Sequence, residues 1–200
     1  CAMVQLFNGM QSSLSMVYDR EMGSMRVLLT TPLPRWFLLL GRLTASVVVS
    51  LAQVYVFLTI AYLFGIELPL MGYVTVLPAL ILSGLMLGAL GMLLSSTIRQ
   101  LENFAGVMNF VIFPMFFASS ALFPLWKIQE SSLALFHICN WNPFTYAVEL
   151  IRFALYVQLN WTALAMVTAA LFVFLGLAIW AYNPSRGIVA HRAGAGGPPG

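Results

Sequence analysis

Few side chains in this sequence are of the types that carry out chemistry, and their spacing predicts no catalytic centre. His137 and Cys139 are two residues apart and are both of metal-ligating types, but such a pair is a weak signal, and we interpret them as ordinary residues of a hairpin. The other histidine, His191, falls on the opposite side of the membrane in the topology predicted below. The motifs GxSxG and HExxH are absent, and so is the phosphate-binding motif GxxxxGK followed by Ser or Thr. The sequence therefore predicts no enzyme, no resident cofactor, no nucleic-acid partner and no hydrolysis of nucleotide by this chain alone.

Charged residues are scarce along most of the chain but gather in the stretch Val17–Arg35. On a helix that begins at Tyr18, one stripe is apolar and another is polar. The polar stripe consists of Asp19, Gly23, Arg26 and Thr30. Pro32 and Pro34 end such a helix and let the chain turn into the next hydrophobic run. The pattern alone leaves two interpretations open: an interfacial helix that presents its charged face to a soluble protein, and a solvated loop that only anchors the topology.

The composition is typical of a membrane protein. Hydrophobic residues make up 61% of the sequence and charged residues 8%, whereas about a quarter of the residues of a soluble domain are charged. Four uncharged runs each exceed the roughly 20 residues that a helix needs to cross the hydrocarbon. These runs are Leu43–Ile66, Leu68–Ile98, Asn103–Trp126 and Phe153–Ser185. We predict a partial first helix at 1–17 and spans near 36–64, 74–98, 103–124 and 161–182.

Basic residues predict the orientation of these spans. We place the segment Asp19–Arg42, the loop Arg99–Glu102 and the tail on one side of the membrane. Of the 9 Lys and Arg residues, only Lys127 and Arg152 then lie on the other side. The positive-inside rule makes the more basic side cytoplasmic. The tail at 186–200, which is rich in Gly, is predicted to be disordered there. With this orientation, the partial first helix enters from the outside, which implies at least one earlier span if the native N-terminus is cytoplasmic.

Residues 126–152 are predicted to form a re-entrant hairpin of short helices on the outer face. The uncharged stretch within it is too short and too polar to cross the membrane, and its free backbone groups need protein cover. Asn142 and Pro143 suit the N-cap and the first position of a helix. Glu149 and Arg152 are three residues apart on that helix, and we expect them to pair.

Two features within the spans suggest packing or a pathway. Gly84 and Gly88 form a GxxxG pair, for which packing within the chain is favoured over a dimer seam. Pro114 is expected to kink its helix, and Asn109, one turn earlier, is a candidate for lining a pathway. A hydrogen bond from Asn109 to a neighbouring helix is the favoured alternative.

Several motifs, in order, resemble those of one transporter family. Residues 19–24 (DREMGS), 28–32 (LLTTP) and Arg35 are similar to the pattern ExExGT…LLxTPxxR of the ABC-2 type permeases. That family's second signature is matched by Phe113-Pro114, residues 120–124 (SALFP) and residues 142–152 (NPFTYAVELIR). The matches extend over residues 17–155 and agree with the predicted topology. The sequence is thus identified as a member of this family, the membrane subunits of ATP-binding-cassette exporters.

The resemblance implies an all-α polytopic membrane protein whose ABC-2 type transmembrane domain occupies residues 1–185. Six spans are typical of the family, so the first span and part of the second are expected to be missing here. Residues 18–31 would form a coupling helix that docks on a separate ATPase. The candidate ATPase contacts are Asp19, Arg20, Glu21, Gly23, Arg26 and Arg35, of which Arg26 stands where an acidic residue is often found. The candidates in the outer hairpin are Asn142, Pro143, Tyr146, Glu149 and Arg152.

The same resemblance implies a permease that works as a homo- or heterodimer in a bacterial inner membrane, in contact with lipid. ATP and Mg²⁺ would be bound by the partner ATPase. An alternative from another class is a passive membrane assembly factor or scramblase with no ATPase, which co-purification would distinguish. No residue in the sequence selects a substrate.

Overall fold

The structure, a computed structural model, describes residues 1–21, 35–66, 69–98, 101–122, 127, 130 and 132–181. Every regular element within these ranges is a helix. The helices are α1 (Ala2–Glu21), α3 (Arg35–Leu63), α4 (Leu70–Thr97), α5 (Leu101–Phe117), α7 (Leu133–Trp141), α8 (Pro143–Leu155) and α9 (Trp161–Ala181). The predicted all-α membrane fold is confirmed. Most of the predicted coupling helix and the tail at 186–200 lie outside the described residues.

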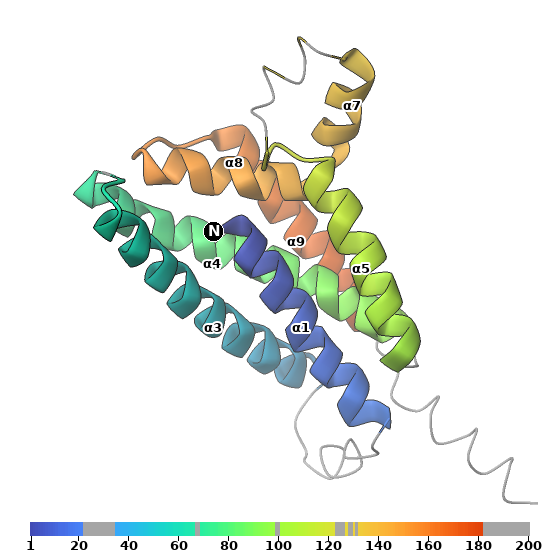
Figure 1. The fold of residues 1–200 in the computed structure, drawn as a ribbon. Coiled ribbons are helices and arrows are strands. Elements are labelled where there is room, and N and C mark those ends of the chain that lie inside the picture. The colour runs from blue at the N-terminus through green and yellow to red at the C-terminus, as the bar shows by residue number, and fades with distance from the viewer. Residues whose placement is uncertain are drawn as a thin grey trace, which may run out of the picture.

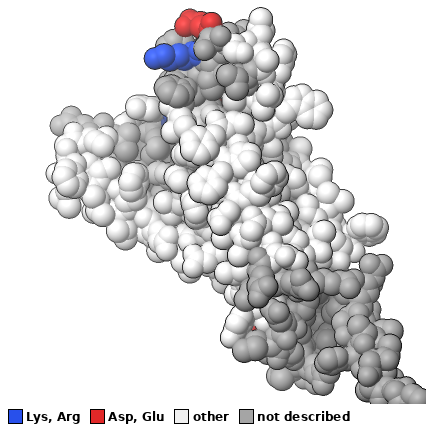
Figure 2. All heavy atoms as spheres, turned by 45° about the vertical axis from the view of Figure 1, so that its right-hand side comes forward, with Lys and Arg blue, Asp and Glu red and all other residues white. Residues whose placement is uncertain are grey.

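Three of the described helices are long and apolar enough to cross a membrane. They cover Trp36–Leu63, Leu70–Thr97 and Trp161–Ala181, with 28, 28 and 21 residues. The run predicted to span at 103–124 forms a shorter helix, because α5 has 17 residues and ends at Phe117. On the face drawn in Figure 2, the coloured charged side chains gather at the α7 end, and the long flank below them is almost free of charge. Such a flank is suited to lipid.

The central helix of the bundle is α4, which packs against α1, α3, α8 and α9 (Figure 1). In its most apolar window, 61% of the residues are buried, against 28% in α3 and 22% in α9. Both α4 and α9 are apolar on all sides, as is typical of membrane-spanning helices, whereas α1 combines an apolar face with a polar stripe. Figure 1 shows α8 lying across one end of the bundle, with α7 beyond it.

Small residues let the backbones of α1 and α4 approach closely. A side chain on Gly9 would lie 3.1 Å from the backbone nitrogen of Gly88, and one on Gly91 would lie 2.7 Å from the carbonyl oxygen of Gly9. A side chain on Gly84 would meet Gln5 of α1 and Val47 of α3. The predicted role of the Gly84–Gly88 pair in packing within the chain is therefore confirmed.

A buried hydrogen-bonded link fixes the register of α1 on α4. The Gln5 amide, which is 1% exposed, donates to the carbonyl of Leu80 at 2.6 Å and accepts from the hydroxyl of Ser83 at 2.7 Å. A polar side chain buried among apolar helices is costly unless it is paired in this way. The link therefore specifies one position of α1 along α4.

Candidate functional site

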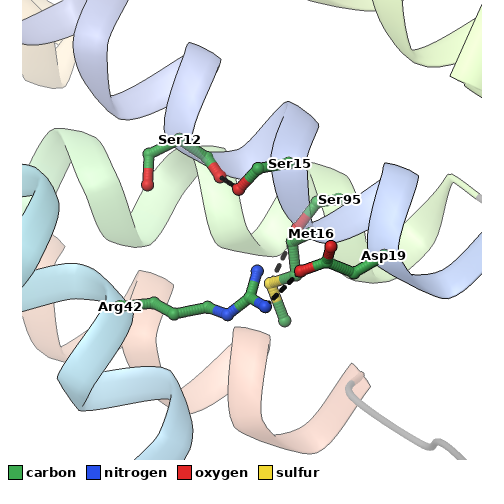
Figure 3. A network of polar contacts seen from close by, with 6 residues as sticks. All are labelled: Ser12, Ser15, Met16, Asp19, Arg42 and Ser95. Atoms are coloured by element: carbon green, nitrogen blue, oxygen red, sulfur yellow. Dashed lines mark hydrogen bonds and ion pairs between the residues drawn. The ribbon is translucent and has the colours of Figure 1, made fainter. Parts of the chain in front are cut away.

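Polar side chains on α1 and α3 face one another along a shared seam. At one end, the guanidinium of Arg42 forms an ion pair with the carboxylate of Asp19, and Figure 3 shows Arg42 reaching from α3 toward α1. At the other end, the amide of Asn8 donates to the side-chain oxygen of Gln53 at 2.7 Å. The two links are the same number of residues apart on both helices, as expected for an antiparallel pair in register. At 1.5 Å per residue, the links are roughly 16 Å apart.

Between the two links, the seam opens into a groove of about 530 Å³. Eight of its ten lining residues are polar, and the stretch between the links is lined by Gln11, Ser12, Ser15, Ala45, Ser46 and Val49. Most of these side chains are small, which explains why the helices leave a hollow where the seam is not bridged. Beneath the groove, a void of about 10 Å³ touches Gly88 and Met92 of α4. This volume is roughly what one water molecule needs.

The ion pair shows one intrachain partner of Asp19, a candidate residue for contacting or positioning an ATPase. Its carboxylate binds Arg42, the two side chains are 31% and 30% exposed, and its role toward an ATPase stays a prediction. The predicted contacts Arg20, Glu21 and Arg35 lie on α1 and α3, but their side chains are outside what the structure describes, as are Gly23 and Arg26 entirely. Their role in docking stays a prediction.

Exchanging the two charges tests whether this pair positions α1 against α3. We expect Asp19→Arg alone to lower the temperature of thermal unfolding, because two guanidinium groups then meet, and Asp19→Arg with Arg42→Asp to restore it. A half-exposed pair contributes about 0.2–1 kcal/mol, so the shift should be small. The exchanged pair also places a cation in the last turn of α1, where the helix dipole favours it. Unfolding in detergent measures the effect, and a double variant no more stable than the single one contradicts the positioning role.

Asn142 joins the α7–α8 hairpin to the end of α5. Its side-chain oxygen accepts from the backbone nitrogen of Phe144 at 3.0 Å, so the predicted N-cap is confirmed, with Pro143 at the start of α8. Its amide nitrogen donates to the carbonyls of Met115 at 2.7 Å and Ala118 at 2.8 Å. The last carbonyls of a helix have no partner within the helix. Asn142 thus provides partners at the α5 terminus, where the apolar run stops being helical.

Arg152 strengthens the same junction instead of pairing with Glu149. Its guanidinium donates to the carbonyl of Ser120 at 2.8 Å, so the expected close ion pair with Glu149 does not form, although the two charges still interact. Ser120 is fully buried, and its hydroxyl donates to the carbonyl of Thr145 on α8 at 3.4 Å. Burial raises the pKa of the Glu149 carboxyl, and the charge of Arg152 opposes this shift. The hydroxyl of Tyr146 donates to the side-chain oxygen of Asn140 at 3.0 Å and links α8 to α7.

Neither pathway candidate lines the groove, and Pro114 directly precedes Met115, whose carbonyl accepts from Asn142. Asn109 and Pro114 are exposed on α5, and Asn109 makes no hydrogen bond to another residue that the structure describes, so the favoured alternative finds no support there. Arg42, Gln53 and Asn8 were missed as a set by sequence reasoning. The sequence contains a signal for Arg42 and Gln53, because positions 42, 46, 49 and 53 share one face of an otherwise apolar helix.

Comparison with known proteins identifies the family. The family model of the ABC-2 type transporter matches residues 1–156, which include the α1–α3 seam and the α7–α8 hairpin. The putative transport permease ycf38 of Porphyra purpurea is 34% identical over 155 residues, which are 76% of this chain and 52% of that protein. The proteins of the same name from Pyropia yezoensis and Cyanophora paradoxa are also 34% identical, with the same coverage. The chain spans about half the length of these relatives. It belongs to the ABC-2 type transporter family.

Proposed function

We propose that this chain is the membrane-spanning permease subunit of an ABC exporter, driven by a separate cytoplasmic ATPase. Membership of the ABC-2 type transporter family carries the proposal. ATP and Mg²⁺ would be bound by the ATPase, since the residues of this chain contain no phosphate-binding loop. A second permease subunit, identical or related, would complete the pathway. The basic bias of the loops favours an orientation with the tail in the cytoplasm.

The geometry around residues 22–34 supports coupling at this segment. The segment connects α1 to α3, and the ion pair between Asp19 and Arg42 ties those helices together close to it. The α1 helix is in turn seated on the central helix α4 through Gly9 and Gly91. A force applied by an ATPase to this segment would therefore move α1 and α3 as a pair, and the motion would reach α4. This is how nucleotide-driven closure would open the pathway between two subunits.

Association with an ATPase tests the proposal. We expect Glu21→Ala in the full-length protein to reduce both co-purification of the ATPase and ATP-driven transport in vesicles, because Glu21 belongs to the proposed docking segment. The amount of inserted protein should not change. Glu130→Gln is the matched control, since it removes one carboxylate from the predicted outer face.

Unchanged association of Glu21→Ala would contradict docking at this segment. A stable complex that contains no ATPase, and that moves lipid passively, would instead establish the scramblase alternative.

A further inference from the structure

The groove between α1 and α3 is unusual because of where it lies. The α3 residues next to it on the outward side are apolar and exposed, for example Val48 at 64% and Phe57 at 52%. Within the hydrocarbon, polar side chains are costly unless they pair with one another or line a wet cavity. Eight of the ten residues that line this groove carry polar groups beside an apolar wall, and hydrocarbon chains alone would leave those polar groups without partners. Within the residues that the structure describes, these polar groups face an open groove, which water or a molecule with polar groups could fill.

Several hydrogen-bonding groups in the groove are available to such a molecule. The side chains of Gln11, Ser12 and Ser46 make no hydrogen bond to any residue that the structure describes. Amide and hydroxyl groups both donate and accept, so they match a ligand that bears hydroxyls. The formal charge in the groove is balanced, because Asp19 binds Arg42. These features favour a neutral ligand over an anion or a cation.

The dimensions and the open side of the groove indicate an amphipathic ligand. A volume of about 530 Å³ lies within the range of roughly 300–1,000 Å³ that is typical of small-molecule sites. Val49 lines the groove and is 52% exposed, so the polar hollow borders the apolar face of α3. We propose that the α1–α3 groove binds the neutral, hydroxyl-bearing head group of an amphipathic molecule, whose apolar chain lies along Val49 and Val48.

Cysteine protection in nanodiscs tests this site without any ATPase or nucleotide, so its outcome is separate from that of the proposed function. Ser46→Cys and Ser12→Cys are made singly in the full-length protein with Cys1→Ala and Cys139→Ala. Phosphatidylcholine nanodiscs supply a bilayer without hydroxyl-bearing head groups. We expect a water-soluble maleimide to label both groove positions, whereas Val48→Cys, on the apolar side of α3, should resist labelling.

Addition of dodecyl maltoside below its micelle concentration should then slow labelling of the groove cysteines. At twice the dissociation constant, the rate should fall about threefold, whereas dodecyl phosphocholine, which has the same chain and a zwitterionic head, should have little effect. Gln11→Leu should weaken this protection, since it removes one of the available hydrogen-bonding groups. A second arm uses nanodiscs that contain a glycosyl diacylglycerol: protection there identifies a lipid of the bilayer as the source, and protection only by the added maltoside identifies a separate amphiphile.

Two results would overturn the proposal. Groove cysteines that resist labelling as Val48→Cys does would show that another segment or subunit covers the groove. Equal protection by the maltoside and the phosphocholine would show that the alkyl chain, and not the hydroxyl-bearing head, is recognised. Having both Ser46→Cys and Ser12→Cys keeps the test decisive if one variant fails to fold.

Discussion

Asn142→Asp is expected to release the Phe117 end of α5 from the hairpin while α8 stays capped. An aspartate keeps the oxygen that accepts from Phe144, and it is as good an N-cap as asparagine. It cannot donate to the carbonyls of Met115 and Ala118, and it places a negative charge beside them. Losing two hydrogen bonds and leaving their acceptors unpaired should cost about 2–4 kcal/mol. The measurement is thermal unfolding, together with hydrogen exchange at the end of α5.

Asn160→Asp is the matched control for this experiment. Asn160 lies just before α9, and its side-chain oxygen accepts from the backbone nitrogen of Ala163 at 3.1 Å. Its side-chain amide nitrogen donates no hydrogen bond to any residue that the structure describes, so an aspartate should be tolerated at this position. If both variants unfold at the same temperature, the junction between Asn142 and α5 does not stabilise the protein.

The two kinds of interaction that Asn142 makes differ in whether the sequence alone predicts them. Its role as an N-cap depends on the next two residues, so it could be predicted from Asn142-Pro143 alone. Its amide contacts lie 24 and 27 residues away in the chain and depend on how α5 meets the hairpin. The same limit applies to the length of α5, because the uncharged run continues past Phe117 and Pro114 lies inside the helix and does not mark its end.

The ion pair between Asp19 and Arg42 shows the same limit. The motif around Asp19 predicts a contact or positioning role toward a partner, and Arg42 enters the sequence-based prediction only through the orientation of the membrane spans. Their pairing joins residues 23 apart in the sequence, and no local pattern specifies it. Long apolar helices such as α4 and α9 were predictable, because the length and composition of a run are local properties.

Gly91→Ala is expected to dislodge α1 from α4 and to destabilise the whole bundle. The new methyl group would lie 2.7 Å from the carbonyl oxygen of Gly9 and would also collide with the hydroxyl of Ser13. The Gly9 carbonyl already accepts from that hydroxyl at 2.8 Å, so both atoms are held in place. The backbone of α1 must therefore shift, which typically costs about 1–3 kcal/mol in a packed interior. Because α1 forms one wall of the groove, labelling at Ser12→Cys should change as well.

Gly176→Ala separates this steric effect from the general effect of adding a methyl group to a membrane helix. Gly176 lies within α9, and nothing is within 4 Å of the position that its methyl group would take. Alanine has a higher helix propensity than glycine, so this variant should be as stable as the parent or slightly more so. Thermal unfolding in detergent compares the two variants. If Gly91→Ala unfolds at the same temperature as Gly176→Ala, then α1 has room to shift on α4. The contact between α1 and α4 would then be too weak to transmit force from the 22–34 segment into the bundle.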